Sequence, residues 1–82
     1  MNTEDIKTKR KTGMEDVFLG QKIKEARLNR SVGLTDLGKR IGVTAQQIQK
    51  YENGKNRISA LRLRDIARVL DVRICTFLGE EE

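Results

Sequence analysis

Residues 34–54, LTDLGKRIGVTAQQIQKYENG, are the most informative part of the sequence. It predicts two short helices joined by a tight turn, in which Gly42 ends the first helix and Thr44 caps the second, over residues 45–52. Such a motif also needs a small residue where the helices approach, here Gly38, and apolar residues that face inward from both helices. The expected inward residues are Leu37, Ile41, Val43, Ile48 and Tyr51. Because the whole set stands in register in one short stretch, the sequence predicts a helix-turn-helix.

The segment before this motif has the apolar spacing of another helix. Asp16 is expected to cap it, and the chain is expected to leave the helix near residues 31–33. The expected inner face comprises Leu19, Ile23, Ala26, Arg27 and Arg30.

The segment after the motif is the clearest amphipathic helix of the chain, with Ser59 as its expected cap. Its inner face is expected to hold Leu63, Ile66, Ala67 and Leu70, with Arg62, Arg64, Asp65 and Arg68 mostly outside. A fifth turn or helix around residues 74–78 would lay Phe77 and Leu78 over the core. The sequence shows no sustained period-two alternation, so it predicts an all-α fold, a compact five-helix domain over residues 14–79.

The two ends differ in composition from this domain. Residues 1–13 hold almost no apolar side chains and four basic ones, which predicts a disordered basic arm, with a plain solubilising tail as the alternative. Residues 80–82 are all glutamate and form an acidic tail.

Composition excludes several classes of function. The 82 residues leave room for one domain, and the absence of histidine with a single cysteine argues against triad catalysis, metal sites and internal disulfides. We therefore expect no enzyme, no cofactor and no metal. No stretch has the length of a membrane span or the pattern of a signal peptide, so a cytoplasmic, nucleoid-associated protein is expected. The net charge of +5 indicates a polyanionic partner, nucleic acid before membrane.

Residues 18–78 resemble the Cro and lambda-repressor type (XRE-like) helix-turn-helix family, five-helix DNA-binding domains. LGQKIKEAR matches the first helix of the family, TDLGKRIGVTAQQIQKYENG the second and third, and SALRLRDIARVLDV the fourth, all without a gap.

The gapless alignment contains three departures from the family pattern. Ser31 stands where the family has glycine, Gly33 where it has the Ser/Thr cap of the second helix, and Leu34 where it has a glutamine that bonds a DNA phosphate and braces the recognition helix. The loss of that glutamine should weaken the positioning of the recognition helix, unless another side chain, such as Lys39 or Arg40, takes its role. The alternative alignment takes Gly33-Leu34-Thr35 as the Gly-Leu-Thr of the family and deletes two residues from the second helix. The gapless alignment is preferred because the deletion would shorten that helix by more than half a turn.

The resemblance implies that the third helix lies in the major groove with its N-terminal residues at base edges. The implied base-reading residues are Ala45, Gln46 and Lys50. The residues expected on the DNA backbone are Thr44, Gln47, Gln49, Asn53, Lys55, Asn56 and Arg57. Glutamine can pair with adenine, lysine with guanine, and an alanine methyl can pack on thymine, so these residue types suit base reading. An ordinary polar helix face followed by a solvated loop is the alternative.

The resemblance also implies two structural roles. Arg27 and Glu52 would form a salt bridge between the first and third helices. The fifth helix and its flanks would form a dimer interface, which here comprises Val72, Ile74, Cys75, Phe77 and Leu78. Within that set, Cys75 is expected to be a small buried hydrophobe rather than a redox sensor or an intermolecular disulfide.

These features together predict a sequence-specific regulator of transcription that binds double-stranded DNA. We expect a repressor that binds a palindromic operator as a homodimer. The alternative function is an antitoxin-type protein that binds both DNA and a toxin protein.

Overall fold

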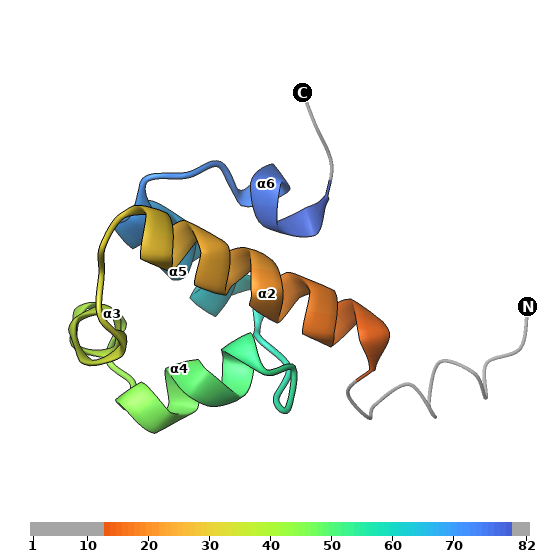
Figure 1. Ribbon diagram of the computed structural model, residues 1–82, viewed down its shortest axis with the longest axis horizontal. Coiled ribbons are helices and arrows are strands. Elements are labelled where there is room, and N and C mark those ends of the chain that lie inside the picture. Colours follow the sequence, from red (N-terminus) through yellow and green to blue (C-terminus); the bar gives the residue numbers. More distant parts are fainter. Residues whose placement is uncertain (1–12, 80–82) are drawn as a thin grey trace, which may run out of the picture.

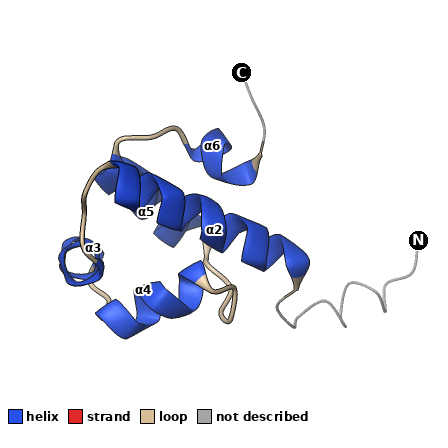
Figure 2. Cartoon of the chain, in the orientation of Figure 1, coloured by secondary structure: helices blue, strands red, loops and turns tan. Residues whose placement is uncertain are grey.

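The computed structural model describes residues 13–79, which form helices throughout with no strand among them (Figures 1 and 2). The helices are α2 (Met14–Asn29), α3 (Leu34–Ile41), α4 (Ala45–Glu52), α5 (Ala60–Leu70) and α6 (Ile74–Leu78). This is the predicted all-α, five-helix fold. The predicted acidic tail and all of the predicted basic arm except Gly13 lie outside the described residues.

Helix α2 separates the two sides of the molecule. Helices α3 and α4 pack against each other on one side of it, and α6 lies on the other side (Figure 1). Helix α4 contacts α2 and α3, whereas α6 contacts α2 and α5. As a result, α4 and α6 present separate surfaces.

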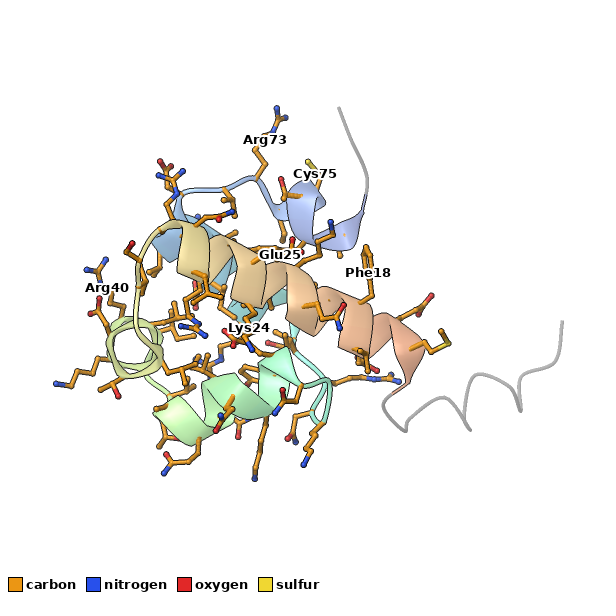
Figure 3. The ribbon with its side chains drawn as sticks, in the orientation of Figure 1. Phe18, Lys24, Glu25, Arg40, Arg73 and Cys75 are labelled. Carbon is orange, nitrogen blue, oxygen red and sulfur yellow. The ribbon has the colours of Figure 1, made fainter. Side chains whose placement is uncertain are left out.

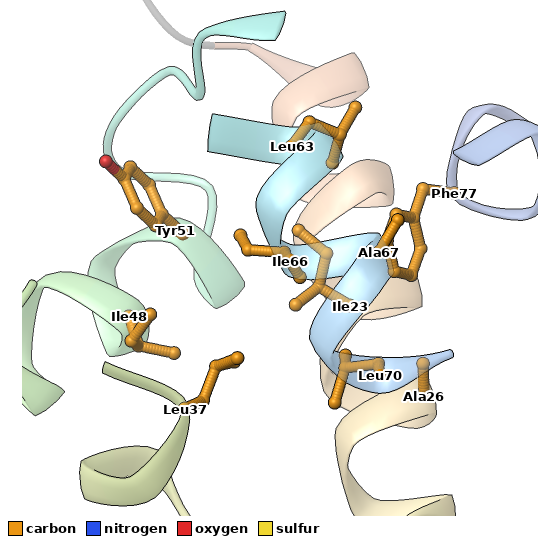
Figure 4. Close-up of a cluster of buried hydrophobic side chains, with 10 residues drawn as sticks. All are labelled: Ile23, Ala26, Leu37, Ile48, Tyr51, Leu63, Ile66, Ala67, Leu70 and Phe77. Carbon is orange, nitrogen blue, oxygen red and sulfur yellow. The ribbon is translucent and has the colours of Figure 1, made fainter. Parts of the chain in front are cut away.

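One apolar core lies between these helices (Figure 4). Helix α5 contributes the four residues of its predicted inner face, and α6 contributes Phe77, which is fully buried. The other buried apolar residues are Ile23, Ala26, Leu37, Ile48 and Tyr51. Tyr51 belongs to the core, as predicted, with its hydroxyl at the edge of the cluster (Figure 4). None of the described helices is both long and apolar enough to cross a membrane.

The turn between α3 and α4 follows the predicted chemistry. Gly42 has a φ of 82°, in the left-handed region that favours glycine, and the Val43 amide donates to the Gly38 carbonyl at 2.8 Å. A Cβ on Gly38 would overlap the Val43 carbonyl oxygen, so only glycine allows the turn to pack this closely against α3. Thr44 caps α4 by accepting a hydrogen bond from the Gln47 amide at 3.0 Å.

The start of α2 differs from the prediction. Gly13, and not Asp16, is the N-cap; Asp16 lies at the third helical position, where its Oδ2 accepts from the Gly13 amide at 2.8 Å. A carboxylate in the first turn can bond back to the chain that enters the helix, so the acid stabilises this end without being the cap.

Three side-chain placements were also wrong. Arg30 is exposed at the end of α2, where its Nη2 donates to the Asp71 carbonyl at 3.1 Å. Arg62 is half-buried and not on the outer face of α5. Leu78 is 54% exposed, so of the two α6 residues expected over the core only Phe77 is there.

The connection between α2 and α3 supports the gapless alignment. Ser31 has a φ of 57°, in the left-handed region that favours glycine, which is the residue type of the family at this position in the gapless alignment. Gly33 has a φ of −79° and precedes α3 as its N-cap. Gly33 offers no side chain to cap α3. At both positions the residue type of the family would suit the observed backbone better: glycine at residue 31, and serine or threonine at residue 33.

An ion pair holds α2 against α4. The Arg27 Nε donates to the Glu52 Oε2 at 2.6 Å and the Arg27 Nη2 to the Glu52 Oε1 at 3.0 Å, between residues that are 7% and 5% exposed. The remaining Nη1 donates to the Val32 carbonyl at 3.0 Å, so the same guanidinium also fixes the connection to α3. The predicted Arg27–Glu52 salt bridge is confirmed.

We expect Arg27→Met to lower the free energy of unfolding by about 3–5 kcal/mol, because it leaves the Glu52 carboxylate buried without a partner. Urea denaturation followed by circular dichroism measures this loss. The double variant Arg27→Met/Glu52→Leu should be more stable than Arg27→Met. If the loss of unfolding free energy in the double variant equals the sum of the losses in Arg27→Met and in Glu52→Leu, the two residues are not coupled.

We expect Ser31→Gly to raise the free energy of unfolding by about 0.5–1 kcal/mol. Relief of the left-handed strain, about 1–2 kcal/mol, is partly offset by the greater entropy that glycine gives the unfolded chain, about 0.4–1 kcal/mol. The matched control is Ser59→Gly, which removes the hydroxyl that caps α5 and should lower stability by a few tenths of a kcal/mol. Thermal unfolding of both variants checks the opposite signs; a destabilising Ser31→Gly contradicts the argument.

Candidate nucleic-acid interface

Helix α4 is anchored by one face. Ile48, Tyr51 and Glu52 are buried against the rest of the molecule. On the facing side of α2, a Cβ on Gly20 would overlap the carbonyl oxygens of Tyr51 and Glu52. The backbones of the two helices therefore lie in direct contact, and the orientation of α4 is fixed by main chain as well as by side chains.

The opposite face of α4 is polar and open. Gln46, Gln49 and Lys50 are exposed, and Ala45 and Gln47 are half-buried. Side chains of α4 extend away from the other helices along the lower side of the molecule in Figure 3. Gln46 and Lys50 are four residues apart, so they lie on the same face one turn from each other. Every predicted base-reading residue thus has at least part of its surface accessible.

The N-terminus of α4 has free donors. Thr44 is exposed, and since its Oγ1 acts as acceptor for Gln47, its hydroxyl hydrogen remains available to donate. The first amides of a helix also lack helical partners and favour an anion. This end of the helix suits a phosphate.

The loop after α4 carries the other residues that were predicted to contact the DNA backbone. Asn53, Lys55, Asn56 and Arg57 are all exposed. The Arg57 Nε lies 3.6 Å from the Oδ2 of Asp16, which ties the loop to the start of α2. Arg57 therefore has a structural partner that the sequence did not indicate.

Helix α3 borders the same surface, and its first residue, Leu34, stands where the family has a polar glutamine. Leu34 is half-buried and packs against the core. Lys39 and Arg40 are exposed, and the Arg40 Nε pairs with the Asp36 Oδ1 at 3.3 Å along α3. Neither basic residue bonds to the turn before α4 among the described residues.

A second surface lies across α2 from α4. A groove of about 700 Å³ runs between the start of α2 and α6 and is lined by apolar side chains and by two carboxylates, those of Glu15 and Asp16. The apolar lining residues are Met14, Phe18, Leu19, Phe77 and Leu78. Figure 3 shows Phe18 beside α6 and Cys75 on α6, both away from α4. Phe77 was predicted to be part of a dimer interface; its side chain is fully buried in the core of its own chain, and Phe77 also lines this groove, so its place in an interface stays a prediction.

The sequence pattern did not mark Met14 and Phe18 as surface residues, although they are 87% and 46% exposed. The one indication in the sequence is that the start of α2 has more apolar residues than its inner face can hold. Val72 is half-buried, and Ile74 is 39% exposed. Cys75, expected to be buried, is only half-buried.

Comparison with known proteins places these features in a family. Residues 23–77 match the family described as Helix-turn-helix. The chain is 43% identical over 80 residues to the HTH-type transcriptional regulator y4wC of Sinorhizobium fredii, covering 98% of this chain and 56% of that protein. The chain spans little more than half the length of the curated relatives it matches.

Solved structures share the fold. The clp gene regulator ClgR from Corynebacterium glutamicum superposes with a TM-score of 0.78 at 19% identity, covering 83% of this chain and 72% of that one. The biofilm regulator SinR, solved in complex with DNA, superposes with a TM-score of 0.67 at 31% identity, covering 73% of this chain and 97% of that one. The described fold, its motif and these matches show that the chain belongs to the XRE-like helix-turn-helix family.

Proposed function

We propose that this chain is a regulator of transcription that binds double-stranded DNA in a sequence-specific manner, with α4 in the major groove. The observation that carries the proposal is the division of α4 into a buried face, which includes Glu52, and an exposed face of amide and ammonium donors. A helix fixed on one side and polar on the other can enter a groove that is about 12 Å wide without rearranging. SinR, which is 31% identical, has been solved with DNA and supports the assignment.

In this proposal Gln46 and Lys50 read base edges and Ala45 packs on a thymine methyl. The Gln46 amide carries both a donor and an acceptor, which match the N6 and N7 of adenine, while the Lys50 ammonium favours the two acceptors of guanine. One such bidentate contact contributes about 1–3 kcal/mol of discrimination.

The backbone contacts in this proposal come from both ends of α4. Thr44 binds a phosphate at the helix N-terminus, and Lys55 and Asn56 bind phosphates after its C-terminus, with Gln47, Gln49, Asn53 and Arg57 in supporting positions. The charge of this region favours the arrangement. Residues 34–57 hold five basic and two acidic residues, of which Glu52 is buried against Arg27 and Asp36 pairs with Arg40.

We further propose that the protein represses transcription as a homodimer on a palindromic site. The groove between the start of α2 and α6 offers exposed apolar side chains on the side of α2 away from α4, so a second copy bound there leaves both α4 helices accessible. A two-fold dimer of this kind places its reading helices about 34–36 Å apart, one turn of DNA. A protein that covers its operator blocks access to it without needing any other activity.

The base-reading assignment predicts different outcomes for two substitutions. Selection of binding sites from random DNA duplexes should enrich a palindrome. On that site, Gln46→Ala should lower the preference for one base at one position by about tenfold. Lys55→Ala should weaken binding to all sequences alike and reduce the slope of log affinity against log salt concentration by about one. Fluorescence anisotropy over a salt series measures both effects.

The control for that experiment is Gln21→Ala, which removes an exposed glutamine from α2 and should leave base preference unchanged. Selection that enriches no sequence contradicts the proposed function. An unchanged preference in Gln46→Ala contradicts the role of that residue alone.

The dimer proposal predicts that Leu78→Asp raises the dimer dissociation constant by at least tenfold, because a two-fold interface buries the new carboxylate twice. The matched control is Leu61→Asp, since Leu61 is also exposed, at 65%, but lies on α5 and does not line the groove. Sedimentation equilibrium of the wild type and both variants measures the constants. A monomeric wild type contradicts the dimer proposal, and a stable complex with a toxin protein at the groove would favour the antitoxin alternative.

A further inference from the structure

Arg62 of α5 makes a contact that links α5 to the helix-turn-helix. Its Nη1 donates to the carbonyl oxygen of Ile41 at 2.6 Å, across a sequence separation of 21 residues, in a part-buried setting. The backbone of Arg62 is itself held, because its amide donates to the Ser59 Oγ at 3.1 Å. The guanidinium therefore extends from a capped, well-fixed first turn of α5.

The acceptor of this hydrogen bond occupies a sensitive position. Ile41 is the last residue of α3, and the carbonyls at the end of a helix lack helical partners and carry its partial negative charge. The chain then turns through Gly42 and Val43 and starts α4 after Thr44. A cation on the Ile41 carbonyl thus fixes the point from which the reading helix departs.

No other basic side chain near the turn does this among the described residues. Lys39 and Arg40, expected from the sequence to replace the missing glutamine at Leu34, are exposed on α3, and the hydrogen bond that Arg40 makes goes to Asp36. A hydrogen bond to a charged group, shielded in part from water, is stronger than one between neutral groups.

We propose that Arg62 is a positioning residue for DNA binding: it holds the turn between α3 and α4 from α5 and so sets the orientation of α4 against DNA. The inference deepens the proposed function and rests on it for the DNA part, while the restraint on the turn is a property of the protein alone. Arg62 acts through the Ile41 carbonyl and binds no phosphate.

The test compares Arg62→Met with Arg68→Met and Arg62→Lys. Arg68 is exposed on the same helix, so its replacement removes the same charge without touching the turn. Amide hydrogen exchange of the free protein measures the turn directly, because the Val43 amide is bonded to the Gly38 carbonyl across it. The Ile66 amide, in the core segment of α5, reports global unfolding in each variant.

We expect exchange at Val43 to accelerate by about tenfold or more relative to Ile66 in Arg62→Met, to change little in Arg68→Met and to be intermediate in Arg62→Lys. Exchange at Val43 that matches the Arg68→Met control overturns the inference. This readout needs no DNA, so it stands even if the wild type proves to have no preferred sequence, which would contradict only the proposed function.

With DNA, the ratio of dissociation constants for a scrambled duplex and the selected site should fall by about five- to tenfold in Arg62→Met, with an unchanged salt slope, because no phosphate contact is lost. A salt slope reduced by about 0.9 with an unchanged ratio would mean that Arg62 binds a phosphate directly, which overturns the positioning role.

Discussion

The buried ion pair of Arg27 and Glu52 fixes how the helices of this protein pack. Its three hydrogen bonds join α2, the end of α4 and the connection that leads into α3. Two charges of this kind are costly to bury, and they are stable only because each satisfies the other in a bidentate geometry. The main contribution of the pair is therefore not net stability. It selects one packing of α2 on α4, because any other packing would leave a buried charge without a partner.

Much of the helix-turn-helix could be predicted because its determinants are local. The bounds of α4, the caps at Thr44 and Ser59 and the left-handed turn at Gly42 follow from residues within one helical turn of each feature. The resemblance to a family added the Arg27–Glu52 pair, which joins residues 25 positions apart and which no local pattern reveals. The left-handed conformation of Ser31 then supports the gapless alignment, which places a family glycine at this position.

What could not be predicted depends on tertiary packing. Arg62 looks like an outer residue of an amphipathic helix, and only the position of α3 beside α5 brings the Ile41 carbonyl within its reach. Asp16 has the residue type of a cap, but the helix starts earlier and the acid bonds back to Gly13. Phe77 and Leu78 are neighbours of similar hydrophobicity, and the short helix α6 sends one into the core and the other to the surface.

The close contact of α2 and α4 at Gly20 bears on how such a protein can diverge. Because the backbone of α2 packs directly on the backbone of α4, the orientation of α4 does not depend on the side chains of its exposed face. Residues 45, 46, 49 and 50 can then be exchanged without moving the helix that carries them. Under the proposed function, single substitutions at these positions would change the preferred DNA sequence while the fold stays the same, whereas replacement of Gly20 would displace α4 as a whole.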